Sequence, residues 1–253
     1  MAYWGNVSKS FKLLYKNPLI FLPDFCYILL SIALLLLTLS LTGLLSIVNK
    51  QEALKAFVEN LLKDPSQVVY LGLIFGVYIL ISFFIKAFFT SFRYSLIKSV
   101  IKNKKVQLKN NIKEGKDYYL SVLLLQLAVF AIILIPFIII GSFLYTGLNT
   151  YLILILSLVT GFILACLFLF RYATLFLKTR GTWKVLFNCW NYFKKNKLHT
   201  ILVLLSLIII NCGFLIVFGI ISFIPIIWFA MGLRSILSLI VSLWSEVFIF
   251  LNY

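Results

Sequence analysis

The stretch "YYLSVLLLQLAVFAIILIPFIIIGSFLYT", residues 118–146, has no charged side chain and exceeds the roughly 20 residues that a helix needs to cross a bilayer. The rest of the chain has a similar character, because 63% of its 253 residues are hydrophobic and only 12% are charged. A soluble domain carries about 45–50% apolar and about 25% charged residues. A water-soluble fold of this length could not bury so much apolar surface. The composition therefore predicts a protein for which the lipid bilayer is the main solvent.

Apolar runs of spanning length occur six times along the chain. None alternates polar and apolar residues as the strands of a membrane barrel do, and a helix satisfies its backbone hydrogen bonds within one segment. The first run is too long for a cleavable signal peptide and lacks a cleavage site. The sequence predicts an all-α polytopic membrane protein, one domain over 1–253, with six transmembrane helices near residues 19–48, 68–92, 118–146, 150–170, 200–222 and 235–253.

Positive charge is distributed unevenly between the two ends of the predicted spans. The net charge is +16, and 18 of the 23 Lys and Arg residues precede the first span or lie in 93–117 and 171–199. The positive-inside rule then predicts a multi-pass protein of the cell membrane with both termini in the cytoplasm. The expected partners of these basic segments are membrane lipids with anionic head groups. Nucleic acid is the alternative that the same charge allows, but it is not the expected partner.

The basic segments also have an amphipathic pattern. In 172–193 the aromatic and apolar residues share one helical face, and the Lys and Asn residues lie opposite. This pattern predicts a helix in the plane of the membrane interface, anchored by Trp183 and Trp190. The N-terminal stretch predicts a shorter helix of the same kind, anchored by Trp4. The connection 49–67 predicts a further amphipathic helix, on the outer surface.

A Phe-Arg-Tyr motif occurs at 92–94 and again at 170–172, each time where a span gives way to a basic segment. The motif suggests three repeats, each a basic interfacial helix followed by a hairpin-like pair of spans: 4–92, 93–170 and 171–253. Arg93 and Arg171 are then expected to contact lipid head groups from the boundary. The alternative is that aromatic and basic residues recur at membrane interfaces for chemical reasons alone.

Two stretches, "KNPLIFLP" (16–23) and "RGTWKVLFNCWNYFKKN" (180–196), resemble the membrane domain of glycerophosphodiester phosphodiesterases and related prokaryotic polytopic proteins. Four residues match the pattern of this family: Gly181, Leu186, Trp190 and Asn196. Arg180 stands where an acidic residue is usual, and Cys189 where Ser is usual. The resemblance implies a helical membrane fold close to lipid. It implies no activity, because no segment is long enough to hold the catalytic phosphodiesterase domain.

Motifs for chemistry are missing from the sequence. The chain has one His, and its four Cys never stand at C-x-x-C spacing, so we expect no metal site, no cofactor and no catalytic residue. Whether the protein is an enzyme stays open. A Gly72-x-x-x-Gly76 pair predicts a close helix–helix contact.

Charged residues within the spans are the remaining candidates for a functional site. Asp24, Lys86 and Glu246 lie at a similar predicted depth, about 8–11 Å below the cytoplasmic surface at 1.5 Å per residue. Such charges are costly in lipid and often functional, so we predict an intramembrane cluster of the three. The alternative is an Asp24–Lys86 ion pair that only locks two helices, with Glu246 reaching water.

These features favour a protein that handles lipids or small solutes, as a transporter or a lipid-binding module. The alternative is a non-catalytic scaffold or accessory subunit with a protein partner in a membrane complex, because packing signals are abundant and catalytic motifs are lacking. An insertase-like role is the third hypothesis.

Overall fold

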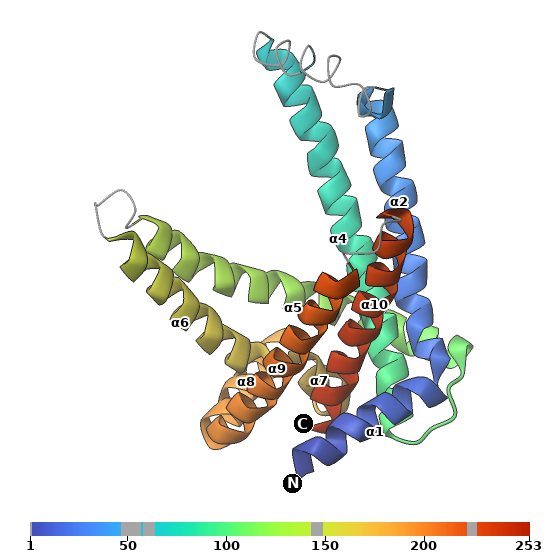
Figure 1. The fold of residues 1–253 in the computed structure, drawn as a ribbon, viewed down its shortest axis with the longest axis vertical. Helices are drawn as coiled ribbons and strands as arrows, with labels where there is room; N and C mark the ends of the chain where they lie inside the picture. The colour runs from blue at the N-terminus through green and yellow to red at the C-terminus, as the bar shows by residue number, and fades with distance from the viewer. Residues whose placement is uncertain (1, 47–56, 58–63, 143–148, 222–226) are drawn as a thin grey trace. The chain divides into compact units, whose positions relative to one another are not determined.

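The computed structural model describes residues 2–46, 57, 64–142, 149–221 and 227–253, and no β-strand occurs among them. Short 3-10 helices lie at Pro18–Phe21 and Leu44–Ser46. The α-helices, labelled in Figure 1, are α1 (Ala2–Lys16), α2 (Leu22–Leu41), α4 (Pro65–Ile101), α5 (Leu108–Ser142), α6 (Thr150–Phe168), α7 (Arg171–Leu177), α8 (Thr182–Lys195), α9 (Lys197–Ile221) and α10 (Ile227–Leu251).

Six helical segments are long and apolar enough to cross a membrane, which confirms the six predicted spans. At most 33% of the most apolar window of any of them is buried within the chain, so most of the apolar surface must be covered by lipid. The segments are Pro18–Leu41, Pro65–Ile101, Leu108–Ser142, Thr150–Leu177, Lys197–Gly219 and Met231–Leu251.

The helix α4 extends well beyond the apolar run that predicts it. It begins at Pro65, a favoured first residue, after Asp64 accepts hydrogen bonds from the Ser66 backbone N–H (3.0 Å) and hydroxyl (2.6 Å). These two bonds lower the pKa of Asp64. The helix then continues through the basic segment to Ile101, and Asn103, with a φ of 51°, turns the chain toward α5. Most of the basic segment 93–117 is therefore helical, as the end of α4 and the start of α5.

The described chain forms two units. The small unit is Leu22–Thr90, with α2 and the first part of α4; the large unit is Met1–Phe21 with Ser91–Tyr253. In the large unit α1 packs against α10, and α5 packs against α6 and α8. Its two ends lie side by side, because the Asn6 Nδ2 donates to Asn252 Oδ1 at 2.9 Å (Figure 1).

The single surface helix predicted over 172–193 is wrong. The chain forms α7 and α8 instead, separated by residues 178–181. Gly181 is the N-cap of α8, and its φ of 124° is a conformation that residues with a Cβ rarely adopt. The helix α7 is part of the core, where Leu175 and Phe176 are buried. Only α8 keeps an exposed aromatic face. The predicted outer helix over 49–67 falls almost wholly outside the described residues.

Candidate functional site

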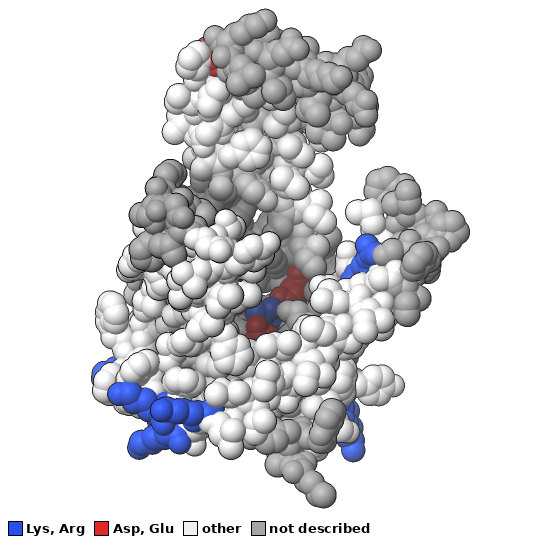
Figure 2. All heavy atoms as spheres, turned by 60° about the vertical axis from the view of Figure 1, so that its left-hand side comes forward, with Lys and Arg blue, Asp and Glu red and all other residues white. Residues whose placement is uncertain are grey.

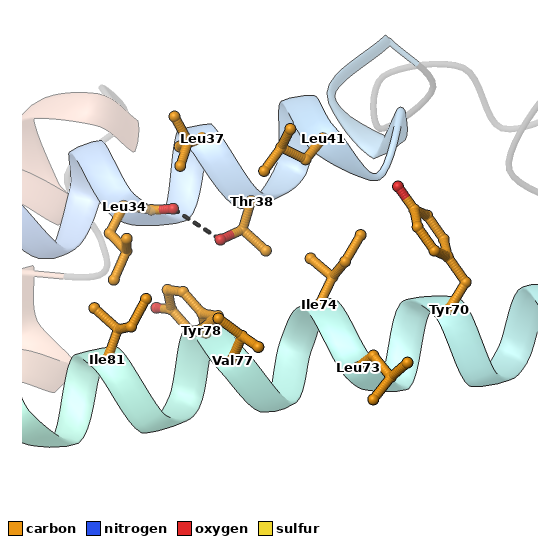
Figure 3. Close-up of a pocket in the computed structure, with 10 residues that line it drawn as sticks. All are labelled: Leu34, Leu37, Thr38, Leu41, Tyr70, Leu73, Ile74, Val77, Tyr78 and Ile81. Carbon is orange, nitrogen blue, oxygen red and sulfur yellow. Dashed lines mark hydrogen bonds between the residues drawn. The ribbon is translucent and has the colours of Figure 1, made fainter.

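A groove that lipid could occupy lies between two helices of the small unit. It has a volume of about 320 Å³ and lies between α2 and α4. In Figure 3 Leu34 and Thr38 of α2 face Ile74, Tyr78 and Ile81 of α4. The remaining lining residues are Leu37, Leu41, Tyr70, Leu73 and Val77.

The groove offers little for a polar ligand to bind. Its polar side-chain atoms are three hydroxyl groups, and the Thr38 hydroxyl already donates to the Leu34 carbonyl at 2.9 Å. The lining on α4 extends from Tyr70 to Ile81, which is about 17 Å at 1.5 Å per residue. The groove is therefore long, apolar and parallel to its two helices.

Asp24 and Lys86, two of the three charges predicted to cluster, also belong to the small unit. Asp24 lies in the first turn of α2, and its Oδ2 atom is buried. Lys86 is exposed on α4. Among the residues that the structure describes, no ion pair joins the two. Their convergence with Glu246 stays a prediction.

Glu246, the third charge, is held in the core of the large unit. Its Oε1 accepts a hydrogen bond from Arg93 Nη2 at 3.3 Å, and its Oε2 accepts one from the hydroxyl of Tyr94. Both side chains of the Arg93–Glu246 ion pair are largely buried, with 15% and 22% of their surface exposed. The carboxylate therefore joins α10 to α4, two helices about 150 residues apart in the sequence.

Aromatic rings surround this ion pair. Tyr94 is fully buried and stacks on Tyr172 (4.3 Å between ring centroids) and on Phe250 (5.4 Å). Gln126 of α5 donates to the hydroxyl of Tyr172 at 3.1 Å. The two Phe-Arg-Tyr motifs thus meet in space, through their tyrosines, and no local sequence pattern indicates this contact.

The two arginines predicted to reach head groups lie beside these tyrosines. Arg93 contacts Glu246, as described, and its guanidinium lies 5.1 Å from the ring centre of Tyr94. Arg171 donates to the Phe168 carbonyl at 3.2 Å and lies 4.8 Å from the ring centre of Tyr172. Contact of either arginine with a lipid head group stays a prediction.

The helix α8 has one buried and one exposed face. Val185 and Cys189 are buried against the core, and the Cys189 Sγ lies 3.7 Å from the Thr174 Oγ1 of α7. Burial raises the pKa of the Cys189 thiol. On the other side Trp183 (77%), Phe187 (65%) and Trp190 (43%) are exposed. Trp183 and Trp190 are thus free of the protein core, as anchors in a membrane interface must be.

A second pocket lies where α7 gives way to α8. It has a volume of about 370 Å³ and is lined by Thr179, Trp183, Lys184, Phe187 and Asn188. The Asn188 Nδ2 donates to the Thr179 Oγ1 at 3.4 Å. In Figure 2 the blue Lys and Arg atoms gather mainly along the lower edge, and white atoms cover most of the sides. The lining of this pocket therefore includes the ammonium group of Lys184 and the aromatic rings of Trp183 and Phe187.

The close helix contact predicted at Gly72 and Gly76 is not formed within the described chain. A Cβ built at either glycine meets no atom within 4 Å. The close approach occurs at Gly115 of α5, where a Cβ would lie 3.0 Å from the Cα of Phe92. Trp4 lies in α1, but its side chain is outside the described part of the structure.

The two basic helical extensions of α4 and α5 are joined by a polar network that the sequence did not reveal. Glu114 accepts a hydrogen bond from the Ser95 hydroxyl at 2.9 Å and forms an ion pair with Lys98. Asn111 accepts a hydrogen bond from the Ser99 hydroxyl at 2.7 Å, and its Oδ1 shares the single Ser95 hydroxyl hydrogen with Glu114, at 3.1 Å from the Ser95 Oγ. The spacing of polar residues along one face of each helix could have suggested it.

A comparison of the chain with protein families gave one match, to a family described as Domain of unknown function (DUF7847), over residues 1–253. The chain belongs to this family. No curated protein and no solved structure matched it.

Proposed function

We propose that this member of the DUF7847 family is a lipid-binding protein of the cell membrane, and that the α2–α4 groove holds one acyl chain of a bilayer lipid. The observation that carries the proposal is the groove, which is apolar, about 320 Å³ in volume and parallel to two spanning helices. Acyl chains in a bilayer run in the same direction as transmembrane helices and need no polar partner. Lipid is also the medium that surrounds these helices.

A small polar solute fits this groove less well. Binding sites for such ligands place several polar groups around the ligand, whereas here only the hydroxyls of Tyr70 and Tyr78 remain after Thr38 bonds its own helix. This difference favours a lipid-binding module over a solute transporter.

A scaffold or accessory subunit is the second candidate. The observation in its favour is the open surface at Gly72 and Gly76, where a helix of another protein could approach closely. The insertase-like role and the resemblance to glycerophosphodiester phosphodiesterases stay predictions.

The proposed orientation has both termini in the cytoplasm. The concentration of Lys and Arg in alternate connections supports it. In a Cys-free background, Asp64→Cys should react with an impermeant thiol reagent applied to intact cells, and Lys105→Cys should not. The reverse labelling would overturn this orientation.

Lipid binding in the groove is tested by native mass spectrometry of the purified protein in mild detergent. Ile74→Trp fills the groove and should remove one retained lipid. Ile79→Trp is the matched control, because Ile79 is an exposed residue of the same helix outside the groove lining.

Two results would contradict the proposal. One is equal lipid retention by the wild type, Ile74→Trp and Ile79→Trp. The other is a stoichiometric protein that co-purifies and is lost when Gly72 and Gly76 are replaced by Ile, with no retained lipid. The second result would support the scaffold.

A further inference from the structure

We infer that the α7–α8 pocket binds the phosphate of an anionic phospholipid. This inference rests on the proposed lipid-binding function and specifies the head group that a second lipid would carry. The pocket is formed entirely within the large unit, by five residues from the turn after α7 and the first part of α8.

Besides Trp183 with its indole N–H, three of the five lining residues can donate hydrogen bonds to a phosphate. Lys184 carries a full positive charge and three N–H donors, and it is exposed. Asn188 uses one amide N–H for Thr179 and has a second left for a ligand. The Thr179 hydroxyl accepts the bond from Asn188, so its own hydrogen can point into the pocket. One cation and two neutral donors on adjacent turns suit an oxyanion.

The charges around the pocket favour an anionic lipid over a zwitterionic one. Residues 171–199 contain seven Lys and Arg and no Asp or Glu. A choline or ethanolamine group would find no carboxylate in this segment, whereas a phosphate that carries the net charge of its lipid is attracted by the exposed lysines of α8, which are Lys184, Lys194 and Lys195.

The two aromatic lining residues explain why the phosphate should belong to a lipid. Trp183 and Phe187 are 77% and 65% exposed, and with Trp190 they follow one another along a single face of α8. Large exposed aromatic side chains favour the head-group level of a bilayer. A phospholipid bound through its phosphate would place its glycerol and upper acyl carbons against these rings, a contact that free phosphate cannot make.

The test is native mass spectrometry of the full-length protein in micelles that contain equal amounts of phosphatidylglycerol and phosphatidylcholine with identical acyl chains. The wild type should retain phosphatidylglycerol in preference. Lys184→Gln should lower that preference by about tenfold, as expected for the loss of a hydrogen bond between charged groups. Lys195→Gln, which removes the same charge from the exposed end of α8, should change it less than about twofold.

A charge-neutral variant separates a built site from a general attraction. Thr179→Val should also lower the preference, although the net charge is unchanged. Equal losses from Lys184→Gln and Lys195→Gln, with none from Thr179→Val, would overturn the site in favour of non-specific attraction. Equal retention of both lipids by the wild type would overturn it as well.

Two further arms separate the possible sources of the phosphate and the two lipid sites. Inorganic phosphate, added at constant ionic strength, should not displace phosphatidylglycerol; efficient displacement would assign the pocket to free phosphate and overturn the lipid. Ile74→Trp should lower the number of bound lipids without changing the head-group preference. Lys184→Gln should lower the head-group preference without changing the number of lipids bound in the groove. Failure of the groove and failure of the pocket are therefore distinguishable.

Discussion

The two units of the chain differ in the hydrogen bonds that their polar side chains form between helices. In the large unit hydrogen bonds connect different helices: Tyr94 to Glu246, Gln126 to Tyr172 and Asn6 to Asn252. In the small unit Thr38 of α2 and Thr42, which directly follows α2, donate to carbonyl groups of that helix. The large unit contains most of the fully buried large side chains, whereas the apolar residues of the small unit are mostly exposed.

The difference teaches what holds helices together when the solvent is lipid. An apolar side chain gains little by leaving lipid for another helix, so association depends on close packing and on hydrogen bonds between helices. The large unit has both, at Gly115 and around Glu246. In the small unit a groove remains between two helices.

Glu246→Ala should destabilise the large unit more than any other change proposed here. The change leaves the Arg93 guanidinium and the Tyr94 hydroxyl in the core without the carboxylate that they share. Removal of one partner of a buried ion pair costs about 3 kcal/mol or more, so the thermal unfolding midpoint in detergent should fall by several degrees. Asp117→Ala is the control, because Asp117 is exposed on α5. A shift no larger than that of the control would mean that the ion pair contributes nothing to the fold.

Replacement of single glycines by alanine compares the packing of the two units directly. Gly115→Ala should lower the free energy of unfolding by about 1–3 kcal/mol, because its Cβ would lie 3.0 Å from the Phe92 backbone. Gly76→Ala should leave stability unchanged or raise it by under about 1 kcal/mol, because its Cβ meets open space and alanine favours the helix. Thermal unfolding of both variants in the same detergent gives the comparison; destabilisation by Gly76→Ala alone would reverse it.

Removal of one tyrosine hydroxyl in each unit should give the smallest difference. Tyr94→Phe loses the hydrogen bond to Glu246 but keeps the ring stacks, so it should cost about 1–2 kcal/mol. Tyr78→Phe in the groove should cost almost nothing. Unfolding midpoints measure both, and equal costs would show that the hydroxyl of Tyr94 is no more important than that of a tyrosine facing lipid.

The fold was predictable to the extent that it depends on local properties. Length and hydropathy located all six spans, because the cost of exposing backbone and charge to lipid acts on each segment separately. The break between α7 and α8 was missed because the apolar periodicity continues across it, whereas α7 ends at Leu177 and Gly181, with a φ of 124°, is the N-cap of α8.

The candidate site was harder to predict, because it depends on residues far apart in the sequence. The predicted depth of Glu246 gave no indication that its partners would be Arg93 and Tyr94, about 150 residues away. Gly115 stands in the polar stretch "KEGKD", which is typical of a loop, so its contact with Phe92 had no local signal.

The contact between the two ends of the large unit also sets an order of events during synthesis. Asn6 bonds Asn252 and Phe11 stacks on Trp244, with ring centroids 5.1 Å apart. The partners Asn6 and Asn252 are 246 residues apart, so at about 5–20 residues per second α1 waits for about 12–50 s before α10 has been made. During that interval the apolar face of α1 needs another surface, and the membrane interface, which its alternating aromatic and lysine residues suit, is the nearest one. The helix α1 therefore completes its packing only after α10 has been made.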